Sequence, residues 1–354
     1  MLKKVGFAII GVGNIGPVHA AAINQSSNAE LVAVSDVILE RARKLAATYP
    51  GVKAYSNYRK MLKDPAVQAV CLCVPSGLRQ NIAITCLKAG KHVLAEKPLE
   101  VTTARIDRMI TAADASDVLL GCIFQTRYTK AVQLVWQALQ EGRFGQLILG
   151  NAYIKWYRPE EYYTGAAWRG TKNLDGGGAA MNQGIHYIDL LGMIMGQVKQ
   201  VWAQSQCAVH QKLRELGTED LITAQLKFAN GAFGTIEAST ALWPGGTARL
   251  EIYGSSGRAV IEDGKLVTWN FQKKQLVDAE VEKLMEEKES ETGAAGSDPM
   301  ASLKTKGHQL QIEDFAAAII DNRVPLIDGR EGRPAVELIE AMYKSASTGR
   351  IVRL

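Results

Sequence analysis

The sequence contains few cysteines, and their arrangement gives no sign of a metal site. Five cysteines occur among 354 residues, without a Cys-x-x-Cys pair or a Cys/His cluster. Cys71 and Cys73 alternate within an apolar run, so their side chains should point to opposite faces of a strand. We therefore expect no bound metal and interpret the cysteines as reduced core residues of a cytoplasmic protein.

Long apolar runs are also absent. No stretch approaches the roughly 18 apolar residues that a membrane-spanning helix requires. The apolar run after Lys3 and Lys4 is shorter than the hydrophobic region of a usual signal peptide. We therefore expect neither a membrane span nor a secretion signal.

The chain lacks a strong excess of charge of one sign. Its 41 basic and 36 acidic residues leave a net charge of +5, spread along the sequence. This gives no case for a nucleic-acid partner. Hydrophobic residues make up 47% and charged residues 22%, which allows a sizeable core and argues against global disorder. At roughly 150 residues per domain, the length favours two domains.

Strand and helix patterns alternate over the first part of the chain. Strands are expected at 5–10, 31–35, 68–74, 92–95 and 118–122, and helices at 20–24, 40–48, 81–89 and 103–115. Short connections between alternating elements are typical of a doubly wound parallel sheet. We therefore expect a Rossmann domain over residues 1–123.

Strands dominate the pattern after Phe124. They are expected at 146–156, 201–209, 221–228, 232–239, 248–253 and 259–262, with helices at 130–140, 177–195, 307–321 and 331–345. Alternating polar and apolar residues predict a half-buried sheet with one solvated or partner-covered face. Residues 280–300 are charged and contain glycine and serine, which favours a mobile surface loop. Residues 124–354 are therefore interpreted as a second domain.

A glycine-rich run follows the first apolar strand. Gly11, Gly13 and Gly16 fit the G-x-G-x-x-G pattern, with Asn14 and Ile15 between the last two. This spacing at a strand-to-helix junction allows a tight turn, close approach of a pyrophosphate and close helix packing. The free N–H groups at the helix start would hold the anion. The alternative interpretation is an ordinary glycine-rich turn.

Two further features follow neighbouring strands. Asp36 lies twenty residues after Gly16, where a carboxylate can accept hydrogen bonds from both adenosine ribose hydroxyls and repel a 2′-phosphate. This favours NAD, and Arg41 and Arg43 keep NADP as the alternative. The run Val74-Pro75-Ser76 ends the next strand, at the edge where such sheets bind ligands. Both features are also compatible with plain strand-end turns.

Two motifs carry candidate catalytic groups. Lys97 in Glu96-Lys97-Pro98 follows a strand, so it can hydrogen-bond an alcohol or ketone oxygen beside the cofactor. Asn182, His186 and Asp189 share one stripe of the expected helix over 177–195. A histidine titrating near neutrality suits a general base that takes a hydroxyl proton. The alternative is a core histidine with Asp189 as its partner.

Four ordered motifs resemble the glucose–fructose oxidoreductase/inositol dehydrogenase/MocA family across essentially the whole chain. They occupy residues 11–16, 73–76, 96–98 and 176–189. The resemblance implies an α/β protein in which an N-terminal Rossmann domain joins a C-terminal α+β domain. The second domain would carry an open-faced, mostly antiparallel sheet that packs subunits into homodimers or homotetramers. It also implies Lys97 and His186 as the catalytic pair, and a cis Lys97–Pro98 bond.

Two residues depart from the family pattern. Asn182 occupies a position that is often aspartate in inositol dehydrogenases, and asparagine carries no charge, so it can only position substrate or His186. Arg79 occupies the place of a loop histidine that often follows the Pro-Ser turn. This puts a cofactor or substrate contact at that position in doubt.

Within the family, the run from Asn182 to Asp189 and the upstream Trp168-Arg169 resemble bacterial UDP-N-acetylglucosaminuronate 3-dehydrogenases. Aromatic and basic residues near Tyr157 and Arg158 suit a pyranose ring and an anionic group, or else pack in the core. The residues expected to bind the cofactor are Gly11, Gly13, Asn14, Ile15, Gly16, Asp36, Val74, Pro75, Ser76, Glu96, Lys97, Gln125, Trp168 and Arg169. Those expected to bind substrate are Lys97, Arg127, Tyr128, Tyr157, Arg158, Asn182 and His186, of which Lys97, His186 and Asn182 form the catalytic set.

The leading functional hypothesis is an NAD-dependent dehydrogenase that oxidises a secondary hydroxyl, at C3, of a sugar, sugar nucleotide or glycoside. An inositol or other polyol dehydrogenase is the first alternative. An NAD-dependent glycosidase that oxidises C3 transiently would cleave its substrate with no net NADH. A non-catalytic dinucleotide sensor is disfavoured because both Lys97 and His186 are present.

Overall fold

The computed structural model describes residues 4–286 and 305–354, which form two compact units. The first unit contains residues 4–125 together with 305–333, and the second contains 126–286 together with 334–354. Each unit is built around one sheet, six-stranded in the first and eight-stranded in the second. Among the described residues, no helix is both long and apolar enough to cross a membrane.

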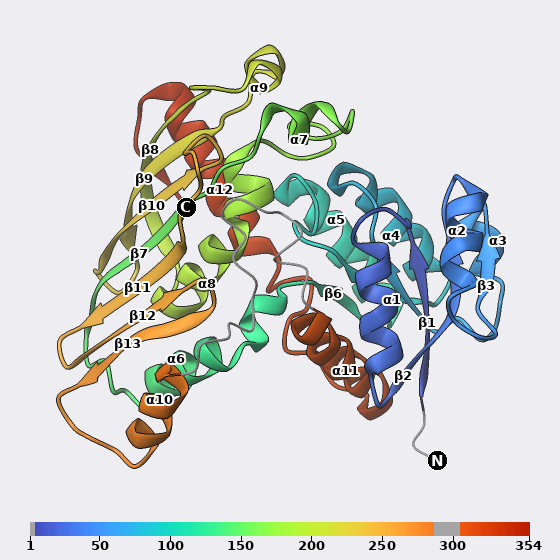
Figure 1. Ribbon diagram of the computed structural model, residues 1–354, viewed down its shortest axis with the longest axis horizontal. Helices are drawn as coiled ribbons and strands as arrows, with labels where there is room; N and C mark the ends of the chain where they lie inside the picture. Colours follow the sequence, from blue (N-terminus) through green and yellow to red (C-terminus); the bar gives the residue numbers. More distant parts are fainter. Residues whose placement is uncertain (1–3, 287–304) are drawn as a thin grey trace. The chain divides into compact units, whose positions relative to one another are not determined.

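The first unit is a doubly wound parallel sheet (Figure 1), as the sequence predicts. Its strand order is β3-β2-β1-β4-β5-β6, and every neighbouring pair is parallel. The strands are β1 (Val5–Ile10), β2 (Ala29–Ser35), β3 (Lys53–Tyr55), β4 (Ala69–Leu72), β5 (His92–Ala95) and β6 (Leu120–Cys122). The chain order reverses between β1 and β4, so their carboxyl ends flank the crevice where such sheets bind ligands.

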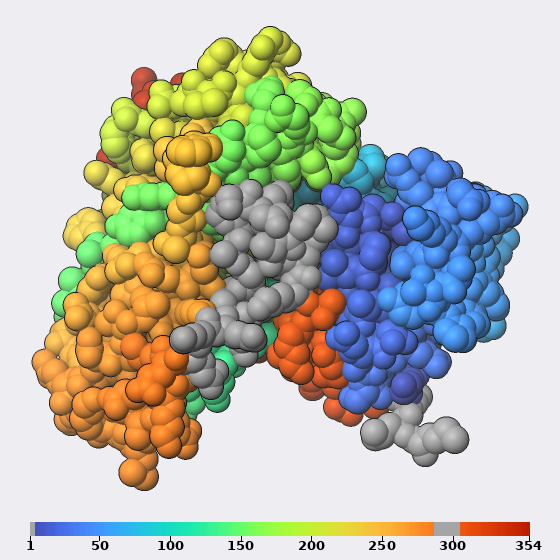
Figure 2. Space-filling view, in the orientation of Figure 1, coloured from blue at the N-terminus to red at the C-terminus, as the bar shows by residue number. Residues whose placement is uncertain are grey.

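The helices of the first unit cover this sheet because the strands are buried on both faces. They are α1 (Gly16–Gln25), α2 (Leu39–Ala46), α3 (Tyr58–Met61), α4 (Arg79–Lys88), α5 (Thr103–Asp114) and α11 (Thr305–Asp321). Helix α11 lies beside α1 (Figures 1 and 2). Ile312 and Phe315 of α11 join the core that contains Phe7 and Ile9 of β1. This burial explains why a helix so late in the chain belongs to the first unit.

The second unit contains a mostly antiparallel sheet, again as predicted. Its order is β13-β12-β11-β7-β10-β9-β8-β14, and only β7 and β10 pair in parallel. The strands are β7 (Leu147–Lys155), β8 (Val198–Gln206), β9 (Leu221–Phe228), β10 (Phe233–Ser239), β11 (Ala248–Gly254), β12 (Gly257–Glu262), β13 (Lys265–Phe271) and β14 (Val352–Arg353). In β9 alternate residues are buried, whereas Thr223, Gln225 and Lys227 are exposed. One face of this strand is therefore polar and open.

The opposite face of that sheet packs against helices. The helices of the second unit are α6 (Lys130–Gln140), α7 (Glu160–Thr164), α8 (Ile185–Met195), α9 (Gln211–Leu216), α10 (Val277–Glu286) and α12 (Arg333–Thr348). Helix α8 contacts β7 and β11. A π-helical turn over Ala179–Gly184 leads into α8. The sheet thus supports the helix that carries His186.

Several predicted elements differ from the structure by a few residues at their ends, and two differ by more. The helix predicted from residue 177 begins as the π-helical turn at Ala179, because Gly177 has a φ of +150° that is incompatible with a helix. The loop predicted over 280–300 is wrong at its start, since residues 280–286 belong to α10. Burial of Val281 and the ion pair between Asp278 and Arg143 anchor this helix. The rest of the predicted loop, residues 287–300, falls outside the described residues.

Candidate active site

The glycine-rich turn joins β1 to α1 at the switch point of the parallel sheet. Gly11 has a φ of +95°, and a Cβ atom there would come within 2.8 Å of the Cys73 main chain. A Cβ atom at Gly16 would lie 2.6 Å from the Gly11 carbonyl oxygen. A Cβ atom at Gly13, in contrast, would meet nothing within 4 Å. Two glycines thus allow close packing, and Gly13 leaves an exposed cradle that fits a pyrophosphate.

The carboxylate of Asp36 is held beside this turn. Its Oδ2 accepts a hydrogen bond from the Val12 amide at 2.8 Å, and its Oδ1 accepts one from the Ile38 amide at 2.9 Å. Asp36 follows β2 directly and is partly exposed. The side chains of Val37 and Ile38 are 92% and 47% exposed, which gives an apolar surface next to the carboxylate. A ribose and a flat base therefore have suitable partners here.

The segment after β4 contributes backbone and a buried hydroxyl. Val74 and Pro75 are partly exposed, whereas Ser76 is buried. Arg79, the departure from the family pattern, donates from Nε to the Val74 carbonyl at 3.1 Å and from Nη1 to the Glu96 carbonyl at 2.7 Å. Burial lowers the pKa of Arg79. In this structure Arg79 therefore holds the main chain of two switch-point segments.

Lys97 follows β5, at the carboxyl edge of the same sheet, and is half-buried. The Lys97–Pro98 bond is cis, as the family resemblance implies. The Lys97 amide donates to Oε2 of Glu96 at 3.1 Å. Burial alone would raise the pKa of Glu96, but hydrogen bonds from His19 and His308 hold it well below its usual range. A buried carboxylate therefore lies directly beside the main chain of the candidate catalytic lysine.

His186 and Asn182 are placed together by the π-helical turn and the first turn of α8. Among residues 181–190, these two alone are partly exposed, and the other eight are buried. A spacing of four residues on continuous helical structure places both on one side. Met181 and Ile185 face the core. The partly exposed imidazole therefore sits in a position open to a ligand, beside an amide.

Asp189, the suggested partner for a core histidine, forms a buried pair with Arg127. Nε and Nη2 of Arg127 donate to Oδ2 and Oδ1 of Asp189 at 2.8 and 2.6 Å. Both side chains are buried. The carboxylate is thus engaged by a guanidinium that the sequence assigns to substrate. The neighbouring Tyr128 and the preceding Gln125 are partly exposed.

The amide of Asn182 is oriented by a carboxylate that the sequence does not mark. Nδ2 of Asn182 donates to Oδ1 of Asp175 at 2.5 Å, and Oδ1 of Asn182 accepts from Nε2 of Gln183 at 2.6 Å. Asp175 is 1% exposed. It also accepts a hydrogen bond from the Gly170 amide at 2.8 Å. A buried carboxyl group therefore lies directly beside the Asn182 amide.

The aromatic and basic residues that the sequence suggests as ligand contacts in the second unit fall into two groups. Arg169 stacks on the Tyr162 ring, 4.2 Å from its centroid, and donates to the Tyr162 carbonyl at 2.7 Å. Trp168 and Tyr157 are partly exposed. Arg158, by contrast, is 1% exposed and donates from Nη2 to Oε1 of Gln183 at 2.8 Å. The first group can contact a ligand, and Arg158 supports the residues around Asn182.

The family models match almost the whole chain. Residues 5–124 match the oxidoreductase family model for the NAD-binding Rossmann fold, and residues 137–354 match the model for its C-terminal alpha/beta domain. The WlbA dehydrogenase of Bordetella pertussis, solved in complex with NADH and UDP-GlcNAcA, is 30% identical. That match covers 99% of this chain and 98% of WlbA, with a TM-score of 0.89.

Curated relatives agree with this assignment. Myo-inositol 2-dehydrogenase of Thermotoga maritima is 27% identical over 352 residues, which cover 98% of this chain and 97% of the relative. Levoglucosan dehydrogenase of Pseudarthrobacter phenanthrenivorans is 26% identical over 288 residues, which cover 73% and 74% of the two chains. With both its domains matched and its motifs in order, this chain belongs to the glucose–fructose oxidoreductase/inositol dehydrogenase/MocA family of NAD-binding oxidoreductases.

Proposed function

We propose that this chain oxidises the C3 hydroxyl of a sugar nucleotide of the UDP-N-acetylglucosaminuronate class to a ketone. The family consists of NAD-binding oxidoreductases whose relatives dehydrogenate sugars and polyols, and this chain is such an enzyme. The observation that carries the finer proposal is the match over 99% of the chain to a dehydrogenase bound to NADH and UDP-GlcNAcA. The Asn182 and His186 pair, and the basic and aromatic residues near it, agree with that ligand class.

NAD⁺ accepts the hydride when it is bound. The cradle at Gly13 and the adjacent carboxylate of Asp36 fit its pyrophosphate and adenosine ribose. A carboxylate at this position repels a 2′-phosphate, which supports NAD over NADP. Asn14, Ile15, Val74, Pro75, Ser76 and Gln125 are proposed to complete the cofactor contacts.

Lys97 and His186 are proposed as the catalytic pair. The Lys97 ammonium would donate a hydrogen bond to the reacting oxygen, which stabilises the negative charge that develops there. The imidazole of His186 would accept the hydroxyl proton as the carbon loses hydride, and would return it in the reverse reaction. The amide of Asn182 cannot act as a general acid or base, so its role would be to hold a substrate hydroxyl beside the imidazole.

The ligand's anionic part is proposed to lie near Arg169. A guanidinium binds carboxylate or phosphate oxygens in a bidentate manner, and its stacking on Tyr162 limits its motion. The partly exposed Trp168 and Tyr157 offer faces for a pyranose ring. Trp168 and Arg169 remain alternative cofactor contacts, and Tyr128 a further substrate contact.

The test is a comparison of kcat/KM, from NADH formation, across UDP-sugars with and without a uronate, free sugars, glycosides and inositols. We expect UDP-N-acetylglucosaminuronate to give the highest value, with a ketone at C3 and an intact glycosidic bond. A preference for neutral free sugars would contradict the proposed substrate class. Bond cleavage without net NADH would indicate the glycosidase alternative.

An inositol or other polyol is the second candidate substrate. The match to myo-inositol 2-dehydrogenase over 98% of the chain favours it. The amide at Asn182 argues against it, because inositol dehydrogenases often place aspartate at this position. Higher kcat/KM for myo-inositol than for every UDP-sugar would establish this alternative.

We further propose that subunits associate through the open polar face of the second sheet, as homodimers or homotetramers in the cytoplasm. Exposed polar residues of β9, among them Thr223 and Lys227, support a solvated or partner-covered face. All five cysteines are unpaired by disulfides, which agrees with a reducing compartment. Light scattering of the protein as it elutes from a size-exclusion column would give the number of subunits, and a monomer would contradict the proposal.

A further inference from the structure

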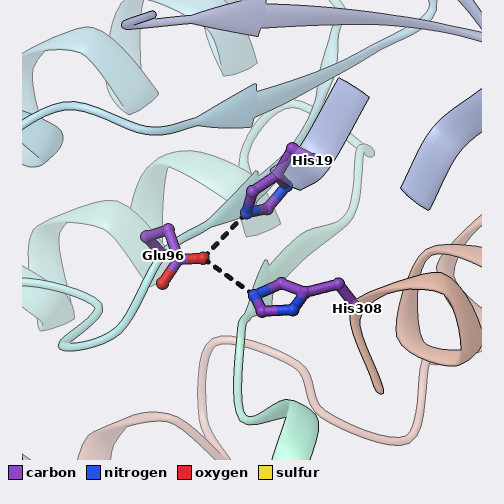
Figure 3. A group of neighbouring side chains, drawn as sticks. All are labelled: His19, Glu96 and His308. Carbon is purple, nitrogen blue, oxygen red and sulfur yellow. Dashed lines mark hydrogen bonds and ion pairs between the residues drawn. The ribbon is translucent and has the colours of Figure 1, made fainter. Parts of the chain in front are cut away.

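Three buried side chains converge in the first unit, and one of them, Glu96, directly precedes Lys97 in the chain (Figure 3). His19 lies on α1, Glu96 follows β5, and His308 lies on α11. Nε2 of His19 lies 2.7 Å from Oε1 of Glu96, and Nε2 of His308 lies 3.4 Å from the same oxygen. All three residues are at most 5% exposed. One carboxylate oxygen is thus approached by two imidazoles from different helices.

The geometry favours hydrogen bonds between the two imidazoles and the Glu96 carboxylate over a bound metal ion. Burial lowers the pKa of His19, and Glu96 stays ionised, so the neutral imidazole of His19 donates from Nε2 to the carboxylate, which His308 also contacts. In the described part of the chain, Nδ1 of neither histidine has a hydrogen-bond partner. A metal on Nε2 would move each proton to Nδ1, where ligating histidines normally find an acceptor. The two unpartnered Nδ1 atoms therefore favour a hydrogen-bonded triad over a metal site.

The other oxygen of Glu96 connects the triad to the catalytic segment. Oε2 accepts the hydrogen bond from the Lys97 amide at 3.1 Å. Arg79 donates to the carbonyl oxygens on both sides of Lys97, those of Glu96 and Pro98. His19 lies three residues after Gly16, in the first turn of the helix that begins at the cofactor turn. Side chains from α1, α4 and α11 thus fix the main chain at Lys97.

We propose that His19 and His308 are positioning residues for Lys97. By holding Glu96, they fix the main chain from which the lysine ammonium reaches the reacting oxygen, and they tie it to the helix that carries the dinucleotide turn. The inference rests on the catalytic role proposed above for Lys97. Neither histidine is proposed to contact substrate or cofactor.

The test compares His308→Leu with His308→Gln in the full-length chain. Leucine fills similar space without a donor, whereas the glutamine amide can donate from nearly the position of Nε2. We expect His308→Leu to lower kcat roughly 10- to 100-fold, because small misplacements of a catalytic group are costly. The KM for the sugar and the Kd for NAD should change less than about twofold. His308→Gln should recover most of kcat.

A second readout does not depend on turnover. Amide hydrogen exchange of the peptide that contains Lys97 should be faster in His308→Leu than in wild type and near wild type in His308→Gln. If no sugar were oxidised by the wild-type chain, the proposed function would fail, and the exchange rates would still decide the positioning role. Should His308→Leu not fold, Glu96→Gln replaces one acceptor oxygen with a donor and should give the same losses.

Three results would overturn the proposal. Equal losses in His308→Leu and His308→Gln would assign the histidine to packing. Unchanged exchange at Lys97 in every variant would show that the triad does not hold this segment. Stoichiometric Zn²⁺ in the purified wild-type protein, absent from His308→Leu, would show that the three side chains form a metal site.

Discussion

Asp175 and Asn182 form a carboxylate–amide pair in which Nδ2 of Asn182 donates to Oδ1 of Asp175 at 2.5 Å. Asn182 lies one helical turn before His186 in sequence, and its bond to Asp175 joins the residue that precedes the glycine run to the π-helical turn. Asp175 is buried and accepts a second hydrogen bond from Gly170. Its carboxylate fixes which way the Asn182 amide faces, so a substrate hydroxyl would meet a preset donor and acceptor.

Replacing Asp175 should therefore impair turnover through Asn182. We expect Asp175→Ala to lower kcat/KM at least about tenfold. It should also lower the free energy of unfolding by about 1–3 kcal/mol, because the donors on Asn182 and Gly170 lose their acceptor. Asp175→Asn retains an oxygen that can accept from Asn182, so it should keep more activity. Steady-state kinetics and denaturant unfolding measure both effects. If Asp175→Ala changed stability alone, the orienting role would be wrong.

Features that depend on neighbouring residues could be predicted from the sequence. The alternation over Leu221–Phe228 gives the bounds of β9, and the glycine spacing gives the turn between β1 and α1. Both are local, since alternation and turn geometry follow from consecutive residues. The family motifs likewise identify the edge of the sheet where Lys97 lies.

Features that depend on distant partners could not be predicted. The two-residue edge strand β14 is defined by its pairing with β8, and nothing local distinguishes it. The edge strand β13 is not among the expected elements, although Asp263-Gly264 between β12 and β13 is a local hairpin signal. His308 meets Glu96 only because Ile312 and Phe315 bury α11 in the first core. No short motif records such contacts, since each arises from packing of helices far apart in the chain.

His186→Ala should abolish turnover while leaving NAD binding largely intact. Loss of a general base typically costs 10²- to 10⁴-fold in rate. His186 is not among the residues proposed to contact the cofactor, so the affinity for NAD should not depend on this imidazole. Isothermal titration with NAD and NADH formation measure the two properties. Equal loss of both would mean that the histidine is structural.

Asp36→Ala should weaken NAD more than NADP. The mutation removes the acceptor for the ribose hydroxyls and the charge that repels a 2′-phosphate. It also removes the acceptor for the Val12 amide, so some loss is expected for both cofactors. Asp36→Asn keeps an oxygen that can accept from the Val12 amide, so it separates the loss of charge from the loss of this hydrogen bond. The ratio of Kd values for NADP and NAD should fall in both variants, and an unchanged ratio would refute the ribose assignment.

His210 and Asp220 should make stability depend on pH. Burial alone would lower the pKa of His210, but hydrogen bonds to Asp220 and to the Arg158 carbonyl raise it above its usual value of 6.5. Burial would raise the pKa of Asp220, but the hydrogen bond from His210 and three from backbone amides lower it below its usual value of 3.8.

The signs of these shifts define the pH window. Because the folded pKa of His210 is raised, its contribution is fully present below 6.5 and is lost as the pH rises through the folded pKa. The contribution of Asp220, whose folded pKa is lowered, is present above 3.8 and is lost in acid. This pair should therefore stabilise the fold most between these two values. Urea unfolding of wild type and His210→Gln across pH 4.5 to 8.5, roughly the range where histidine side chains titrate, should show a difference in free energy of unfolding that shrinks as pH rises. A difference that is constant with pH would mean that the imidazole is neutral in the folded chain.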